Sequence, residues 1–225
     1  MNKKYWWILV LYLIIQVVST FGIYYVALLD NATPFTKEQA NLIVTNWSIG
    51  TFAVGALLFL WLLKTAPRSS YIDQQAPMPL AKSTLYIIGG VIVAFIVQAI
   101  TASITAMIRG TVAQSENTAD LIGITQTNPL FILTIVIIAP FLEEVVFRKV
   151  LFGGLTNKLP VGVAALFSSV VFAAIHFDFA YLLVYTGMGL VFSYFYYKTK
   201  RLLVSFSIHA LMNGTALLIS VFLPN

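Results

Sequence analysis

Two adjacent glutamates and an arginine lie inside a strongly apolar stretch of this chain. The stretch reads Pro140-Phe141-Leu142-Glu143-Glu144-Val145-Val146-Phe147-Arg148. An ionised side chain at the centre of a membrane helix costs about 2.5–3.5 kcal/mol on insertion scales, so such groups mark functional sites by default. Glu144 and Arg148 are four residues apart, acid before base, which favours their pairing on one helix face. Glu143 is rotated by about 100° from Glu144, so we expect it to remain available for chemistry.

The two histidines of the chain come later, also in apolar stretches. His176 follows Phe172 by four residues and Asn213 follows His209 by four, a spacing that places each pair on one helix face. A carboxylate and an imidazole can hold a water molecule, whose proton the carboxylate accepts as general base. A second imidazole and an amide NH₂ can donate hydrogen bonds to an oxyanion on a scissile carbonyl. If Glu143 faces a cavity with these groups, the set suits hydrolysis of an amide bond.

The same side chains leave a metal site open. One carboxylate and two imidazoles match a common catalytic zinc ligand set, which here would be Glu143, His176 and His209. Their spacing differs from the H-E-x-x-H of zinc proteases. No cofactor is therefore certain from the sequence, and a divalent metal such as zinc stays an alternative. The chain has no cysteine, which excludes disulfides, thiolate zinc sites and a cysteine nucleophile.

The composition places these groups in a membrane. Of the 225 residues, 60% are hydrophobic and only 9% are charged, with a mean hydropathy of +0.91, whereas a soluble domain carries about 25% charged residues. The net charge is +5, but the basic residues flank apolar runs, a pattern typical of membrane orientation. We therefore expect a multi-pass integral membrane protein in contact with the lipid bilayer and without a nucleic-acid partner.

Seven apolar stretches reach or approach the length of about 20 residues that a membrane span requires. They cover residues 5–29, 41–65, 83–107, 129–154, 160–177, 179–197 and 202–222. The polar segments 66–82 and 108–128 are predicted to be loops. The first stretch is longer than the apolar region of a signal peptide, so we expect it to be retained. The predicted fold class is an all-α polytopic transmembrane bundle of about seven helices.

The distribution of basic residues predicts a cytoplasmic N-terminus. With that orientation only Lys37 and Arg109 fall outside, apart from Arg148 in the intramembrane cluster, in agreement with the positive-inside rule. In straight helices, however, His209 lies about 10 Å from the inner end of its span, while His176 lies near the outer end of its own. The two rings can share one site only if the helix of His176 is tilted or offset, or if a water-filled funnel connects them.

Taken together, the motifs resemble those of the CPBP family of intramembrane proteases. This family includes the type II CAAX prenyl endopeptidases and the Abi-type bacteriocin-processing or bacteriocin-immunity proteins. Its pattern is E-E-x-x-x-R, then F-x-x-x-H, then H-x-x-x-N or D, and the chain matches every key position at residues 143–148, 172–176 and 209–213. The similarity covers about residues 129–214. It divides the chain into N-terminal helices and loops without a recognised motif, residues 1–128, and a catalytic core, residues 129–225.

The resemblance implies an intramembrane endopeptidase of the glutamic or metalloprotease type in the bacterial plasma membrane. The implied substrates are peptides or small membrane-associated proteins, such as a bacteriocin or signalling precursor. The implied catalytic set is Glu143, Glu144, Arg148, His176, His209 and Asn213. In this set Glu143 would be the general base and His176 would help to hold the water. His209 and Asn213 would polarise the scissile carbonyl. Glu144 and Arg148 would orient the other groups.

Several alternatives stay open. A non-catalytic Abi-type immunity or regulatory protein would tolerate Glu143→Gln and His209→Ala without losing its phenotype. A proton-coupled transporter would use Glu143 and the histidines as a relay, although the sequence lacks the inverted repeat and paired broken helices of such proteins. The pair of Glu144 and Arg148 is also compatible with a purely structural role. Asn213 is also compatible with a hydrogen bond between helices.

Overall fold

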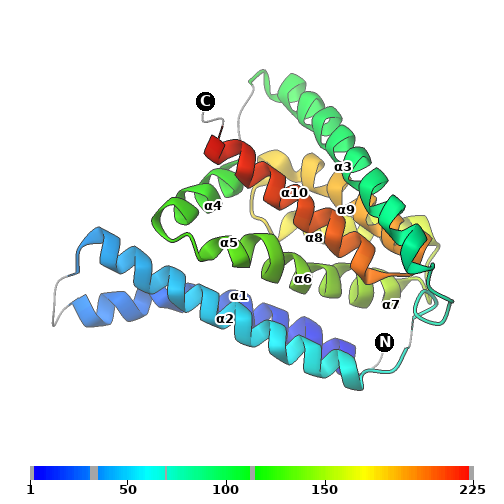
Figure 1. Ribbon diagram of the computed structural model, residues 1–225, viewed down its shortest axis with the longest axis horizontal. Coiled ribbons are helices and arrows are strands. Elements are labelled where there is room, and N and C mark those ends of the chain that lie inside the picture. The colour runs from blue at the N-terminus through cyan, green and yellow to red at the C-terminus, as the bar shows by residue number, and fades with distance from the viewer. Residues whose placement is uncertain (1–2, 31–34, 69, 112–114, 223–225) are drawn as a thin grey trace.

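The computed structural model describes residues 3–30, 35–68, 70–111 and 115–222, and the regular structure in these ranges is helical (Figure 1). The first four helices are α1 (Lys3–Asp30), α2 (Lys37–Thr65), α3 (Leu80–Arg109) and α4 (Glu116–Thr127). A compound helix follows, made of α5 (Phe131–Leu133), η1 (Thr134–Ile138), α6 (Ala139–Glu143), η2 (Glu144–Phe152) and α7 (Gly153–Leu155). The last elements are α8 (Val161–Ala174), η3 (Phe179–Tyr181), α9 (Leu182–Thr199) and α10 (Leu202–Phe222). The predicted all-α fold class is confirmed.

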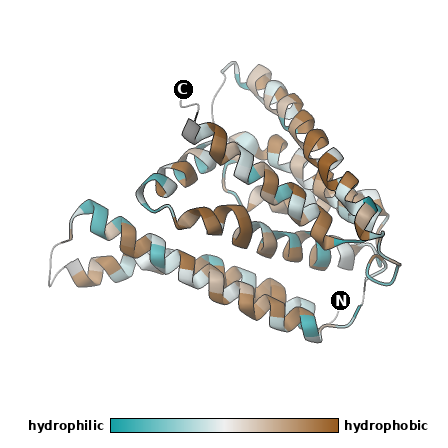
Figure 2. Ribbon diagram, viewed as in Figure 1, coloured by the Kyte–Doolittle hydropathy of each residue, from teal (hydrophilic) through white to brown (hydrophobic). Residues whose placement is uncertain are grey.

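Five helical stretches within the described ranges are long and apolar enough to cross a membrane: α1, α2, α3, η3 with α9, and α10. Many large apolar side chains of these helices are exposed, and Figure 2 shows brown, hydrophobic residues along them. The other two predicted spans are helical but differ in form. Residues 160–177 contain the 14-residue α8, and residues 129–154 form most of the compound helix. The helical membrane bundle is thus confirmed, while the count of seven spans and the cytoplasmic N-terminus stay predictions.

The prediction of a loop over residues 108–128 is wrong for its second half, which forms α4. Residues 112–114 of that segment lie outside the described residues. The hydroxyl of Ser115 accepts a hydrogen bond from the Thr118 N–H at 3.1 Å, which satisfies one of the open donors at a helix start. Glu116 in the first turn also favours the helix dipole. These local features stabilise a polar helix that hydropathy alone does not reveal.

The compound helix changes its hydrogen-bond pattern on both sides of the glutamates. Pro140 lacks an N–H, and its ring would clash with the carbonyl four residues earlier in an α-helix. The preceding segment η1 is a π-helix, in which the Ala139 N–H reaches five residues back to the Thr134 carbonyl. A second π-helix, η2, begins directly after Glu143. Because π-helices are rare and often occur at functional sites, the backbone itself marks this region.

The compound helix lies between two groups of helices. On one side α1 and α2 form a long antiparallel hairpin (Figure 1), with α1 packed on η2 and α2 on η1 and α6. On the other side α8, α9 and α10 pack on it, and α3 covers α9 and α10. The approach of α8 to α9 is close, since a Cβ added at Gly189 would lie 2.8 Å from the Ser169 Cβ. The chain therefore surrounds its charged segment with helices.

A group of four residues, which we call the Asp73 cluster, ties the segment between α2 and α3 to the bundle. Asp73 Oδ1 accepts from the Lys149 ammonium at 2.7 Å and from the Tyr196 hydroxyl at 3.2 Å. Asp73 Oδ2 accepts from the Tyr5 hydroxyl at 2.9 Å. One carboxylate thus connects this segment to α1, η2 and α9.

Candidate active site

Glu144 and Arg148 form a buried ion pair in η2. Arg148 Nη2 lies 3.3 Å from Glu144 Oε1, and neither side chain is exposed, so the pairing expected from their spacing is present. The guanidinium also lies over two aromatic rings, 4.5 Å from the centroid of Phe172 and 5.2 Å from that of Phe192. Such cation–π contacts stabilise a desolvated cation. The arginine is therefore held by one carboxylate and two rings.

The ring of His209 lies between the two glutamates. Its Nδ1 is 3.1 Å from Glu144 Oε1, and its Nε2 is 3.7 Å from Glu143 Oε2. Because an ionised carboxylate only accepts hydrogen bonds, the shorter contact assigns the proton to Nδ1. Phe192 stacks on the imidazole at 4.7 Å with an interplanar angle of 17°. We call Glu143, Glu144, Arg148 and His209 the carboxylate–imidazole cluster.

The separation between His209 Nε2 and Glu143 Oε2 is suited to a bridging water. At 3.7 Å it is too long for a direct hydrogen bond, and contacts of this length are often bridged. An oxygen at normal hydrogen-bond distance from both atoms can be placed beside the line that joins them. The side chain of Glu143 is 15% exposed, whereas that of Glu144 is fully buried. Of the two carboxylates, Glu143 is therefore the one that a reactant can reach.

His176 lies on the other side of Phe172. Its Nδ1 is 2.8 Å from the Phe172 carbonyl, to which it donates as the protonated ring nitrogen. The Phe172 ring contacts both imidazoles edge-on, with centroid distances of 4.8 Å to His176 and 5.9 Å to His209. His176 lies close enough to Glu143 and His209 to interact with both through their charges. One phenylalanine thus holds the two histidines around the glutamates.

The shortness of α8 explains how the two histidines meet. Its 14 residues extend about 21 Å at 1.5 Å per residue, less than the hydrocarbon core of about 30 Å. The chain then turns back through Phe177, whose φ of 53° is left-handed, and enters η3. This is the offset helix that a shared site requires. Asp178 is buried in this turn, with 8% of its surface exposed.

Asn213 forms a hydrogen bond between two helices. Its Nδ2 donates to the carbonyl of Ile135 in η1 at 3.1 Å, which joins α10 to the first π-helix. Within residues 3–30, 35–68, 70–111 and 115–222 it forms no hydrogen bond or ion pair with either glutamate or histidine. The contact is the bond between helices that the sequence left open as an alternative.

The donors as arranged do not form a metal site. Among the described residues, no three or more acidic or histidine side chains gather closely enough to hold an ion. Nδ1 of His209 bonds to Glu144 and Nδ1 of His176 bonds to the Phe172 carbonyl, so a ring of either residue could reach an ion only through Nε2. We therefore derive no step that passes through a metal.

Tyr185, which the motifs do not include, joins α4 to the site. Its ring stacks on His176 with a centroid distance of 4.1 Å and an interplanar angle of 22°. Its hydroxyl lies 2.9 Å from Ser115 Oγ and accepts from Asn117 Nδ2 at 3.2 Å. No sequence pattern indicated this contact, because α4 was predicted to be a loop.

Tyr12 brings α1 to the site. Its side chain is buried, and its ring packs edge-on against Phe147 with a centroid distance of 5.8 Å. The phenol also lies close enough to Glu143 and Arg148 to interact with their charges. A signal for this residue exists in the sequence, since Tyr12 continues a helical spacing with Tyr5 and Ile8, both also buried.

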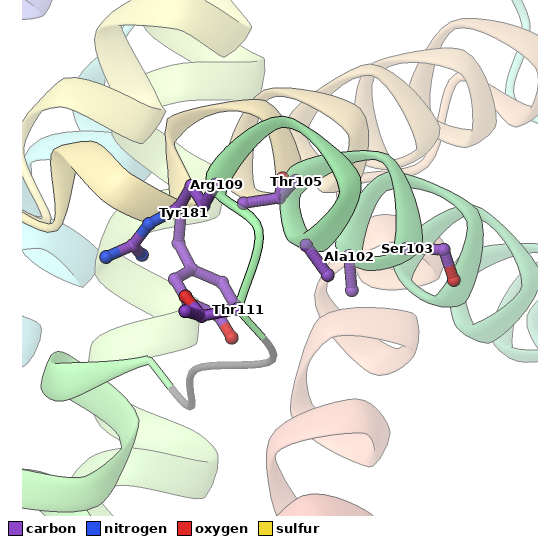
Figure 3. A pocket seen from close by; sticks show the side chains of 7 residues that line it. Ala102, Ser103, Thr105, Arg109, Thr111 and Tyr181 are labelled. Atoms are coloured by element: carbon purple, nitrogen blue, oxygen red, sulfur yellow. The ribbon is translucent and has the colours of Figure 1, made fainter.

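A separate pocket of about 180 Å³ lies at the far end of α3 and contains none of the predicted site residues. Figure 3 shows Arg109, Thr111 and Tyr181 gathered at one end of it and Ser103 at the other. Tyr181 precedes α9 and lies one helical turn before Tyr185 in sequence. The pocket therefore borders the segment that follows His176 and is distinct from the carboxylate–imidazole cluster.

Comparisons with known proteins agree with the motifs. The sequence model of one family, described as type II CAAX prenyl endopeptidase Rce1-like, matches residues 125–215. The chain is 34% identical over 214 residues to the "Putative membrane peptidase YdiL" of Bacillus subtilis (strain 168), a match that covers 95% of this chain and 87% of the relative. It is 40% identical over 141 residues to the "Membrane-embedded CAAX protease MroQ" of Staphylococcus aureus (strain USA300), covering 60% and 57% respectively. No solved structure matches.

Proposed function

This chain belongs to the CPBP family of membrane proteases, which includes the Rce1-like type II CAAX prenyl endopeptidases. We propose that Glu143 activates a water molecule for peptide-bond hydrolysis. The family and the five span-capable helices identify a multi-pass integral protein of the bacterial membrane. The observation that supports the proposal most directly is the position of His209 Nε2, 3.7 Å from Glu143 Oε2.

In the proposed first step, the water donates hydrogen bonds to Glu143 Oε2 and His209 Nε2. Glu143 takes the proton while the oxygen attacks the scissile carbonyl, and the same proton then passes to the leaving amine. Glu144 supports this step by holding the proton of His209 on Nδ1, which keeps the lone pair of Nε2 directed at the water. Arg148 in turn balances the charge of Glu144. A base placed in this way accelerates reactions by about 10²–10⁴-fold.

The other two motif residues receive different roles. His176 is the candidate for a contact with the substrate, because its bond to Phe172 uses Nδ1 and leaves Nε2 for another partner. Asn213 acts as a positioning residue, since its bond to Ile135 connects α10, which carries His209, to the compound helix, which carries the glutamates. We propose peptides or small membrane-associated proteins, including bacteriocin or signalling precursors, as the substrate class.

The test is cleavage of candidate precursor peptides by the purified full-length protein, read by mass spectrometry. Glu143→Gln keeps the size of the side chain but removes the base, so the cleavage rate should fall by about 10²–10⁴-fold. Glu116→Gln is the matched control, because it changes an exposed acid of α4 outside the cluster. The melting temperature of both variants should stay close to that of the wild type.

Full activity of Glu143→Gln would show that another residue acts as the general base. If no peptide is cleaved, while Glu143→Gln and His209→Ala both keep the biological phenotype, the protein is a non-catalytic immunity or regulatory member of the family. The two outcomes are distinct, because the first shows cleavage and the second shows none.

A further inference from the structure

A groove of about 550 Å³ runs between α1 and α2, at the end of the hairpin where α1 begins. Lys3 and Lys4 lie at one end of it, and Trp7 and Trp61 line it close to the lysines. Beyond the tryptophans the lining consists of aliphatic side chains, among them Val10 and Ile14. Its volume is within the range of about 300–1,000 Å³ of small-molecule sites, which are likewise mostly apolar with a few polar groups.

The length of the groove corresponds to one leaflet of a bilayer. The residues that α1 contributes extend from Lys3 to Ile14, a distance of about 17 Å along a helix. Half of the hydrocarbon core measures about 15 Å. Trp7 and Trp61 are each 63% exposed, as expected for tryptophans at the level of the lipid headgroups. The groove is thus charged at the membrane surface and apolar toward the midplane.

The charge at the open end is positive and held in place. Lys4 donates from its ammonium to the Thr65 carbonyl at 2.6 Å, and because a carbonyl is neutral the lysine keeps its charge. Lys3 is exposed, Lys64 lies in the last turn of α2, and none of the described residues that line the groove is acidic. This end is therefore complementary to an anion such as a phosphate.

We propose that the groove binds one anionic phospholipid, with its phosphate at Lys3 and Lys4 and an acyl chain along Val10 and Ile14. A phospholipid has a charged head beside an apolar tail one leaflet long, in the same order as the groove. An extended peptide would need partners for its backbone groups, which the apolar walls do not offer. The bound lipid would hold α1, which carries Tyr12, against α2.

The test is a titration of the purified full-length protein with phosphatidylglycerol or phosphatidylcholine, followed by native mass spectrometry. The wild type should bind one phosphatidylglycerol more tightly than phosphatidylcholine. A basic residue near an anionic membrane contributes about 1 kcal/mol, or about fivefold in affinity. The double variant Lys3→Gln/Lys4→Gln should therefore lose about 25-fold in affinity. Lys82→Gln, which changes an exposed lysine of α3 outside the groove, should lose nothing.

A second pair of variants tests the acyl-chain part of the groove without a change of charge. Val10→Phe would fill the groove and should lower phosphatidylglycerol binding at least tenfold, whereas Val17→Phe, at an exposed position of α1 outside the groove, should bind as the wild type. Equal affinity for both lipids, or wild-type binding by either Lys3→Gln/Lys4→Gln or Val10→Phe, would overturn the proposal. Displacement of the lipid by a substrate peptide at one-to-one stoichiometry would assign the groove to the substrate instead. The readout is lipid binding, so it is independent of peptide cleavage.

Discussion

Two buried charged clusters share the π-helix η2, but they differ in how their polar atoms are satisfied. In the Asp73 cluster both carboxylate oxygens accept hydrogen bonds, from Lys149, Tyr196 and Tyr5. In the carboxylate–imidazole cluster, Glu144 Oε2 and all three guanidinium nitrogens of Arg148 have no hydrogen-bond partner within the described part of the chain.

We attribute the difference to a structural role of the Asp73 cluster and to the proposed catalytic role of the carboxylate–imidazole cluster. Buried polar groups in native proteins are nearly all hydrogen-bonded, so each exception calls for an explanation. In the Asp73 cluster both carboxylate oxygens are hydrogen-bonded, and the cluster acts as a cross-link at the end of the bundle. In the carboxylate–imidazole cluster the unsatisfied atoms belong to the buried side chains of Glu144 and Arg148, while Glu143 is the carboxylate that a reactant can reach. Arg148 and Lys149 are neighbours in the chain, yet each serves a different cluster because they point to different sides of η2.

The largest expected effect is on catalysis by the carboxylate–imidazole cluster. His209→Ala removes the ring that contacts both glutamates, so the water loses one partner and Glu144 loses another. We expect the cleavage rate under single-turnover conditions to fall by at least about 10²-fold. A rate within threefold of the wild type would show that the two carboxylates function without the imidazole.

The next effect is on stability. Arg148→Met leaves Glu144 buried without its cation, which should lower the free energy of unfolding by about 3–5 kcal/mol. Adding Glu144→Gln to this variant removes the unpaired charge and should restore part of the loss, because replacement of both partners is often close to neutral. Thermal unfolding in detergent measures both variants. An equal loss in the single and double variants would mean that packing on Phe172 and Phe192, rather than charge, decides the stability.

The Asp73 cluster should respond in stability alone. Asp73→Asn keeps the shape of the side chain but weakens its bonds to Lys149, Tyr196 and Tyr5, at a cost of about 1–3 kcal/mol. The cleavage rate per folded molecule should not change. Lys149→Met is the matched variant from the other partner and should lower stability by a similar amount. A selective loss of cleavage in Asp73→Asn, with the melting temperature preserved, would remove the distinction between the two clusters.

The smallest effect is expected from a chelator. No three or more acidic or histidine side chains among the described residues gather closely enough to hold an ion, so removal of divalent ions should change the cleavage rate by less than about twofold. The measurement compares the initial cleavage rate with and without EDTA after dialysis. Loss of cleavage that zinc restores would show that side chains of the carboxylate–imidazole cluster rearrange around a metal. It would support Glu143, His176 and His209 as the metal ligands.

The charged residues of the candidate site could be predicted from the sequence for one reason. In a chain with only 9% charged residues, acids and bases inside apolar stretches are costly, so Glu143, Glu144 and Arg148 stand out. The four-residue spacing of Glu144 and Arg148 also predicts their pairing, because it depends on a single helix. The same local logic fails for α4, whose helix depends on the Ser115 cap more than on hydropathy.

The sequence by itself determined the helical membrane class, the identity of the charged residues and the pairing within η2, since all of these follow from composition and from spacing along one helix. Only the tertiary structure decided that His209 lies between both glutamates, that Asn213 bonds to Ile135, and that Tyr185 stacks on His176. These contacts join residues far apart in the chain. Their geometry depends on the early end of α8, the π-helical turns and the rotation of each helix, which packing between helices sets and no local pattern encodes.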